Sequence, residues 1–390
     1  MYKQNEQVFT TVAEALEKKT VDELKKFLPL LSASQKFARK ADLVAFISRH
    51  LYGGHLRVLW EQLDDLQQAA VAETIHAWEG RFHPDRFGAK YGQLPDFGSS
   101  DMWEYRSKPS LLRLFIYNDV MPDEMRRQLK PFVPEPEETT LNVMGEIPET
   151  FNLPWKRFNS KSGKYDSGIQ EIPITIREME CSAQRDVKAV LRLIDLGRVQ
   201  SSNKIRQPAS STMEVIASVL EGGDYYDQPD LSTRKNDYEE EIKYIKAFAW
   251  LPLVRAAGFA ELSGKRLSLT QTGKKALALP TAEVIRTTWQ RWLKTRIFDE
   301  FRRIDCIEGQ EGSGKHRFAA ADKRREVIAN ALKVCPIGEW VKVDDFFRYM
   351  QAADFSFEVH TDPANLYIAD SYYGNLGYRD CHGWNILQGR

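Results

Sequence analysis

The sequence has few of the residues that build cross-linked or metal-bound folds. Only four cysteines occur among its 390 residues, Cys181, Cys306, Cys335 and Cys381, and none belongs to a C-x-x-C pair. This spacing argues against a disulfide framework or a zinc ribbon and fits a reducing compartment. We therefore expect a cytoplasmic protein without a metal or another cofactor.

Long apolar segments are also missing. No run approaches the roughly 18 consecutive apolar residues of a membrane span. The first residues, M-Y-K-Q-N-E-Q, include an acid and contain no apolar stretch of the kind found in signal peptides. These absences predict a chain with no membrane partner.

Catalytic motifs are scarce. Neither G-x-S-x-G nor H-E-x-x-H occurs. The stretch G-Q-E-G-S-G-K-H places Gly309, Gly314 and Lys315 as in a phosphate-binding loop, but His316 stands where that loop needs Ser or Thr. The preceding residues show helical spacing instead of a buried strand. We interpret the stretch as a solvated loop and expect a non-enzyme; an enzyme that uses Lys315 on a nucleotide is the alternative.

Helical patterns dominate the chain and predict a mainly α fold with small β-hairpins. We expect an N-terminal helical domain at 1–132, a linker at 133–172 and winged-helix-like units at 173–305. A loop at 306–322 and a C-terminal winged-helix-like α+β unit at 323–390 follow. The linker prediction depends on the proline-rich acidic stretch after Val133 and the polar, glycine-containing run at 159–168.

The sharpest pattern lies between residues 240 and 280. A helix is predicted to end at Gly258, and the alternating residues of F-A-E-L-S-G-K-R-L-S-L-T predict a hairpin around S-G-K. The stretch T-G-K-K-A-L-A-L then begins another helix. Upstream, Ser182 is a candidate N-cap and Gly197 a candidate terminator of one more helix. Helices followed by a hairpin are typical of a winged helix and its wing.

The net charge is zero, with 55 basic and 55 acidic side chains, but the charges are not evenly spread. Residues 264–303 contain ten basic and three acidic side chains, and residues 184–212 contain six and two. Such local excess supplies phosphate contacts, and polar residues at a helix start reach base edges. The predicted DNA-binding residues here are Lys204, Arg206, Ser210, Ser211, Lys265, Arg266, Lys274, Lys275, Arg291 and Lys294. The aromatic cluster of Trp289, Trp292, Phe298 and Phe301 is interpreted as core, with base stacking as the alternative.

Two stretches resemble known families. T-V-D-E-L-K-K-F-L followed by R-K-A-D-L-V-A-F-I, within 20–51, resembles the SAP-type helix–loop–helix DNA-binding motif. Thr20 is expected to cap its first helix. The resemblance implies that Lys36, Arg39 and Lys40 face DNA.

The second resemblance begins at residue 173. The stretches L-R-L-I-D-L-G-R-V and L-V-R-A-A-G-F-A-E-L-S-G-K-R-L-S-L-T-Q-T-G are similar to winged-helix regions beside XPB-type helicases in bacteria. No helicase motor motif accompanies them, and we expect an N-terminal portion of a longer protein or an accessory subunit.

Together these features predict a non-catalytic DNA-binding or adaptor component of a DNA-processing machine, either helicase-associated or part of a bacterial defence system. DNA and a helicase or other protein subunit are the expected partners. Two alternatives stay open. One is a protein-interaction scaffold whose winged helices bind partner subunits, and the other is a sequence-specific transcription regulator.

Overall fold

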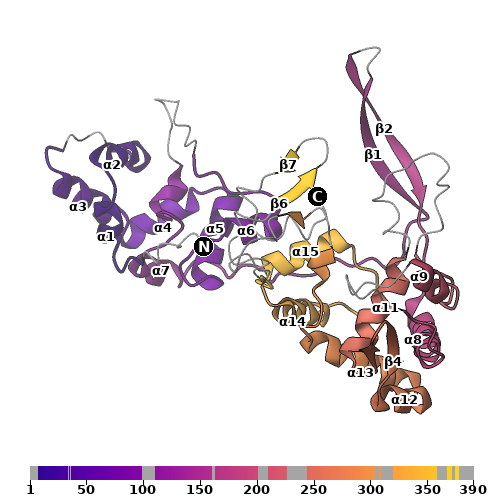
Figure 1. The fold of residues 1–390 in the computed structure, drawn as a ribbon. Coiled ribbons are helices and arrows are strands. Elements are labelled where there is room, and N and C mark those ends of the chain that lie inside the picture. Colours follow the sequence, from indigo (N-terminus) through magenta and orange to yellow (C-terminus); the bar gives the residue numbers. More distant parts are fainter. Residues whose placement is uncertain are drawn as a thin grey trace. The chain divides into compact units, whose positions relative to one another are not determined.

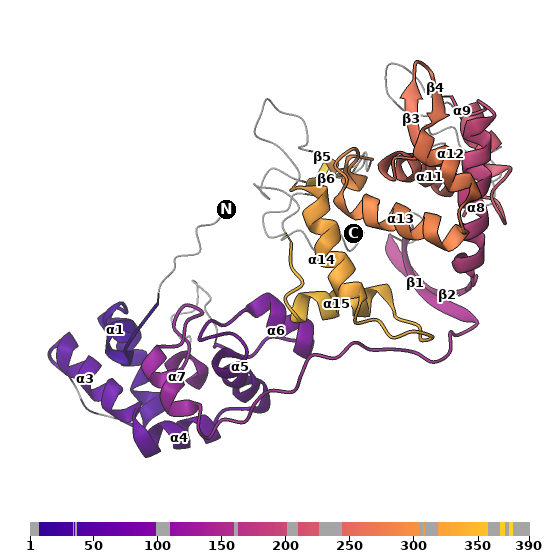
Figure 2. The ribbon, with the colours of Figure 1, turned by 90° about the horizontal axis from the view of Figure 1, so that it is seen from below.

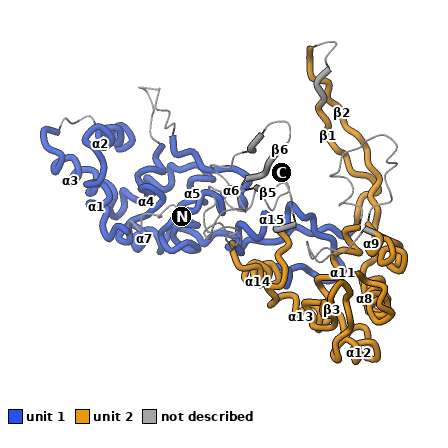
Figure 3. Tube along the Cα trace, in the orientation of Figure 1, with its two compact units in different colours: residues 1–145, 331–356, 387–390 blue, residues 146–330, 357–386 orange. Residues whose placement is uncertain are grey.

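The computed structural model describes residues 8–33, 35, 37–98, 110–159, 163–200, 210–225, 244–303, 307–308, 319–357, 367–370 and 374–376. As predicted, the fold is mainly α, with short antiparallel strands. The chain divides into two compact units (Figure 3). The first comprises the described residues of Met1–Gly145 and Ala331–Ser356, and the second those of Glu146–Asn330 and Phe357–Ile386. Each unit is described by itself.

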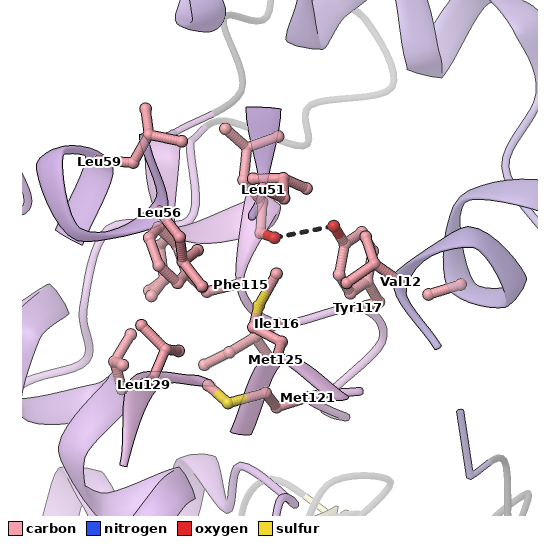
Figure 4. Packing of buried hydrophobic residues seen from close by; sticks show 14 of the residues in the cluster. Val12, Leu51, Leu56, Leu59, Phe115, Ile116, Tyr117, Met121, Met125 and Leu129 are labelled. Carbon is pink, nitrogen blue, oxygen red and sulfur yellow. Dashed lines mark hydrogen bonds between the residues drawn. The ribbon is translucent and has the colours of Figure 1, made fainter. Parts of the chain in front are cut away.

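The first unit consists of short helices around one hydrophobic core. Its helices are α1 (Val12–Glu17), α2 (Val21–Phe27), α3 (Lys40–His50), α4 (Gly53–Glu61), α5 (Asp65–His76), α6 (Pro84–Tyr91), α7 (Asp123–Leu129) and α15 (Val343–Ala352) (Figure 1). The 3-10 turns η1 (Pro29–Leu31) and η2 (Leu111–Leu114) lie between them. Leucine, methionine and aromatic side chains from separate helices meet in this core, among them Leu56, Phe115, Tyr117, Met125 and Leu129 (Figure 4).

Local sequence signals predict the first helices well. Thr20 caps α2 through its hydroxyl, which accepts from the amide of Glu23 at 3.2 Å, while the Glu23 carboxylate accepts from the Thr20 amide. This reciprocal capping box satisfies two amides that a helix start leaves without partners. Leu24 and Leu43 are buried, as the helical spacing predicts.

The second unit contains a winged-helix-like arrangement. Its elements in chain order are α8 (Met179–Asp195), α9 (Ser210–Ala217), α11 (Ile245–Ala256), β3 (Ala260–Ser263), β4 (Arg266–Leu269), α12 (Gln271–Ala278) and α13 (Thr281–Lys294) (Figure 2). Strands β3 and β4 form the predicted hairpin. On the outer side of β4, Gln200 forms a bridge to Arg266, and the Leu267 amide donates to the Val199 carbonyl at 3.1 Å. The segment after α8 therefore pairs with the outer edge of the hairpin through an isolated bridge.

Glycines end two of these helices, as predicted. Gly197 follows α8 with φ +67°, and Gly258 follows α11 with φ +70°. This left-handed conformation strains residues that have a Cβ and is the usual role of a glycine after a helix. The cap predicted at Ser182 is wrong, because α8 already begins at Met179 and Ser182 lies inside it.

The segment predicted as a linker contains a long β-hairpin. Strands β1 (Thr150–Asn159) and β2 (Lys164–Pro173) pair antiparallel over ten residues each. The aromatic ring of Trp155 covers Gly168 on the facing strand, where an added Cβ would lie 2.9 Å from the ring. Glycine in a strand lacks a side chain to pack, and a cross-strand aromatic ring compensates for it. Gly168, in the polar run that suggests a loop, is thus accommodated within a ribbon, while the proline-rich stretch after Val133 precedes β1.

The C-terminal region also differs from the predicted arrangement. Helix α14 (Ala321–Leu332) crosses the division between the units, and α15 packs against α6 of the first unit. Residues 331–356 therefore belong with the N-terminal helices and not with a separate unit at 323–390. Trp340 forms an isolated bridge to Met144. Short strands β5 (Ile307–Glu308), β6 (Tyr367–Asp370) and β7 (Gly374–Leu376) form one antiparallel sheet.

Candidate nucleic-acid interface

The turn of the β3–β4 hairpin presents two basic residues to solvent. Gly264 opens the turn with φ +62°, a conformation that glycine adopts without strain. Leu267 and Leu269 of β4 are buried, so the alternation of a strand directs Arg266 and Ser268 to the opposite, exposed face. Lys265, in the turn itself, is exposed as well. The predicted wing with its two cations is therefore present.

Helix α12 carries the next two cations. The Thr270 hydroxyl accepts from the Gly273 amide at 3.0 Å and donates to the Gly258 carbonyl at 2.7 Å, which joins the helix start to the base of the hairpin. Gly273 and Ala276 face inward, and this leaves Lys274 and Lys275 on the exposed side. A Cβ at Gly273 would lie 1.9 Å from the Phe259 carbonyl oxygen, so only glycine fits there.

A partly buried lysine of α8, Lys188, holds the C-terminal end of α12 in place. The Lys188 ammonium donates to the carbonyls of Ala276, Leu277 and Leu279 at 2.7, 2.9 and 2.6 Å. These carbonyls lack helical partners, and a cation there also complements the helix dipole. Burial lowers the pKa of Lys188, and the nearby Arg192 lowers it further. Lys188 therefore contributes to structure and is not available to a phosphate, although it adds to the basic count of 184–212.

Helix α13 contributes three more basic residues. Val284 and Thr288 are buried, and the exposed side chains include Arg286, Arg291 and Lys294. The helix ends at Lys294. The outer side also contains Trp289, whose side chain is 44% exposed. The interpretation of Trp289 as core is therefore wrong, since the tryptophan lies off the face that Val284 and Thr288 bury.

The basic residues of these three elements are not neutralised within the described part of the chain. Residues 260–294 contain seven cations and two acids, Glu261 and Glu283. No ion pair joins any of the seven to another described residue. The seven are Lys265, Arg266, Lys274, Lys275, Arg286, Arg291 and Lys294, and all are exposed. We call them the basic surface.

Other cations of the second unit have acidic partners. Buried Lys246 pairs with Asp186 at 2.8 Å and so joins α11 to α8. Arg296 pairs with Asp322 at 2.8 Å, and the hydrogen bond from Arg296 lowers the pKa of that carboxyl. Lys246 and Arg296 therefore stabilise the fold through their acidic partners, while the cations of the basic surface are open to a ligand.

Helix α11 occupies the position of the helix that usually reads bases in winged-helix proteins. Six of its twelve residues are buried, including Trp250, Leu251 and Val254. Its more accessible positions are largely apolar, such as Ile245, which is 42% exposed. Base edges are read by hydrogen-bonding side chains such as Arg, Asn and Gln. Helix α11 therefore has little capacity to distinguish sequences.

The three residues that the SAP resemblance predicts to face DNA have different surroundings. Arg39 is the exposed residue that precedes α3. The Lys40 ammonium donates to the Glu17 carbonyl at 2.7 Å and so joins α3 to the end of α1. Lys36 lies outside the described residues.

The remaining predicted site residues lie near the start of α9. Ser211 is exposed in its first turn, and Ser210 is its first residue. Lys204 and Arg206 lie outside the described residues, as does the stretch from Gly309 to His316. For these residues the sequence interpretation stays a prediction.

Other possible sites add little to this interface. A groove of about 600 Å³ in the first unit is lined by residues of α6 and α15, including Asp85 and Arg348. Arg348 pairs with Asp345 at 3.0 Å, so its charge is already balanced. Within the described ranges, no three His, Cys, Asp or Glu side chains gather as metal ligands. No helix among the described residues is both long and apolar enough to cross a bilayer.

The sequence identifies six of the seven residues of the basic surface as site residues and omits Arg286. The spacing of the buried Val284 and Thr288 is the signal that would have placed Arg286 and Trp289 on the outer side of the helix. Comparison with protein-family models, curated proteins and solved structures finds no match to this chain.

Proposed function

We propose that the protein is a non-catalytic nucleic-acid-binding component of a cytoplasmic DNA-processing machine. The observation that carries the proposal is the basic surface, seven exposed cations from the wing, α12 and α13 without acidic partners among the described residues. Phosphates are the ligands that such cations bind most readily. A helicase or a bacterial defence complex as the larger assembly rests on the resemblance of the sequence alone.

The arrangement favours backbone contact over sequence recognition. Lysine and arginine on a wing and on helix surfaces meet phosphates, which position a protein but carry no sequence information. In α11, the helix best placed to read bases, six of twelve residues are buried and most of the others are apolar. A sequence-specific transcription regulator is therefore the less supported alternative.

A salt series with the unmodified chain tests the proposal. Fluorescence anisotropy would follow labelled duplex and single-stranded DNA between about 50 and 200 mM salt. We expect affinity that falls steeply with salt, and the slope of log K against log salt gives the number of phosphates contacted. Absence of binding even at the lowest salt would overturn the proposal.

A second candidate function, a protein-interaction scaffold, is favoured by the β1–β2 ribbon. Phe151, Leu153, Trp155 and Ile172 lie on one face of the ribbon and are 54%, 41%, 42% and 37% exposed. A two-stranded ribbon is at best marginally stable alone in water, and its open edges accept further strands. A second copy of the chain meets both needs: pairing of strand edges would extend the sheet, or packing of two ribbons face to face would cover their apolar side chains.

Self-association distinguishes this candidate. Light scattering across a concentration series should give a dimer that Leu153→Lys with Ile172→Lys converts to a monomer. A monomer at every concentration would remove the ribbon as a homodimer contact and leave only a different protein as its partner.

A further inference from the structure

Four side chains of the second unit form a continuous stack beside the basic surface. The Arg325 guanidinium lies over the ring of Phe298 at 4.9 Å and over the ring of Trp292 at 4.8 Å. The Trp292 ring lies 5.1 Å from that of Trp289, at an interplanar angle of 35°. The order is therefore Phe298, Arg325, Trp292, Trp289, with contacts at distances typical of cation–π and aromatic pairs.

Hydrogen bonds hold the inner part of this stack in place. The buried Arg325 guanidinium donates to the carbonyls of Trp292, Thr295 and Phe298 at 2.8, 2.7 and 3.0 Å. It also donates from Nε and Nη2 to the two carboxylate oxygens of Glu300, each at 3.0 Å. All five N–H groups of the guanidinium are thereby used. Since the Trp292 indole also donates to Glu300 at 3.0 Å, the stack is rigid up to its last member.

The last member is open. Trp289 is 44% exposed, and its surroundings on α13 are basic. Arg286 lies one turn before it, and Arg286, Gln290 and Lys294 follow one another at intervals of four residues along the exposed side. An exposed ring with Arg286 on its own side of the helix and Lys294 on the adjoining exposed side combines the two features by which proteins bind single strands, a surface for base stacking and charges for the backbone.

We propose that Trp289 stacks an unpaired base of single-stranded nucleic acid, with Arg286 and Lys294 contacting the adjacent phosphates. The inference rests on the proposed nucleic-acid binding and specifies its ligand. Bases inside a duplex already stack on both neighbours, whereas unpaired bases along a single strand offer free faces to Trp289. The chain should therefore prefer single strands, or duplexes with a single-stranded end, to blunt duplexes.

Three variants test the stacking. Trp289→Ala removes the ring, Trp289→Phe keeps a smaller ring, and Trp340→Ala removes a tryptophan of similar exposure, 45%, from the first unit. Anisotropy with a single strand of about 12 nucleotides, a length within the range for such sites, would be compared with a blunt duplex. Loss of one stacked base weakens binding roughly 5- to 140-fold. We expect this loss for Trp289→Ala on the single strand, a smaller loss for Trp289→Phe and none for Trp340→Ala.

The outcomes separate the stacking from the proposed function. Unchanged single-strand affinity of Trp289→Ala, with salt-dependent binding intact, would overturn the stacking and leave the proposed function standing. An equal loss on blunt duplex would also overturn it. If the unmodified chain binds neither nucleic acid, the proposed function itself fails. If Trp289→Ala lowers the unfolding temperature, a fluorescence measurement with 2-aminopurine in the single strand replaces it. Stacking predicts that the unmodified chain quenches the 2-aminopurine fluorescence and that Trp289→Phe quenches it less. Absence of quenching by the unmodified chain would contradict stacking.

Discussion

The sequence predicts DNA contacts in two regions, and the cations of those regions have different surroundings. In and beside the SAP-like helices, Lys19 lies 3.6 Å from Glu23, Lys25 lies 3.6 Å from Asp22, and Lys40 donates to a backbone carbonyl. At residues 260–294 the seven basic residues have no such partners among the described residues. A count of basic residues therefore does not identify a phosphate site. A cation is available to a phosphate only if it is not already bonded to an acid or a carbonyl of the fold.

The largest expected effect is a loss of stability in the wing region that leaves the first unit unchanged. Gly273→Ala should destabilise the second unit by about 3 kcal/mol or more, since its Cβ would lie 1.9 Å from the Phe259 carbonyl oxygen and the backbone must shift. Hydrogen–deuterium exchange should increase in α12, β3 and β4. Unchanged exchange there would show that the hairpin base relaxes without cost.

Gly88→Ala in α6 is the matched control. A Cβ at Gly88 meets only Leu94 Cδ2, at 3.6 Å, an ordinary contact distance. Alanine in a helix is favoured over glycine by about 0.5–1 kcal/mol, so exchange in the first unit should stay the same or decrease.

A smaller effect is expected when a lysine that donates to backbone carbonyls is replaced, and it should differ between Lys188 and Lys40. Lys188→Met should destabilise the second unit by about 1.5–3 kcal/mol, because its charged group satisfies the carbonyls at the end of α12. Lys40→Met removes a single hydrogen bond and should cost about 1 kcal/mol in the first unit. Urea unfolding followed by exchange in each unit measures both. Equal costs would mean that the carbonyls beside Lys188 find water instead.

The smallest effect concerns pH. Burial lowers the pKa of His83 from its usual 6.5, and nearby Arg86 lowers it further, while Asp354 and Asp119 oppose this. The unfolded chain therefore binds the proton more tightly than the folded first unit. Stability is greatest above pH 6.5 and decreases as the pH falls from there toward the lowered folded-state pKa. His83→Gln should reduce the dependence of stability on pH, measured by thermal unfolding across a pH series. An unchanged dependence would mean that other groups cause it.

Local signals in the sequence predict much of the fold because they act over a few residues. Thr20 with Glu23, Gly197, Gly258 and the S-G-K turn each determine a cap or a turn by themselves. The β1–β2 ribbon is missed although Phe151, Leu153 and Trp155 alternate, because the proline-rich stretch after Val133 and the polar run that ends at Gly168 suggest a linker. Pro154 is unusual in a strand as well. Only the pairing of Trp155 with Gly168 makes the glycine compatible with a strand.

The candidate site is predicted in part for the same reason. The cations of the wing and α12 follow from the hairpin pattern and are found where expected. The stack that ends at Trp289 depends on Arg325, which lies 33 residues beyond Trp292 in sequence and meets it only in the folded chain. No periodicity encodes such a contact. The commitment of Lys188 and Lys40 to carbonyls is equally nonlocal.

The most direct test of the account compares charge reversal in the two regions. Lys265→Glu with Arg266→Glu changes the wing, and Arg39→Glu with Lys40→Glu changes the SAP-like helices. Anisotropy with labelled duplex across a salt series gives affinity and slope for each. We predict that the wing variant weakens binding and reduces the salt slope by about 2, one for each lost phosphate contact, while the SAP-like variant stays close to the unmodified chain. Loss of binding in the SAP-like variant with an unchanged wing variant would contradict the account.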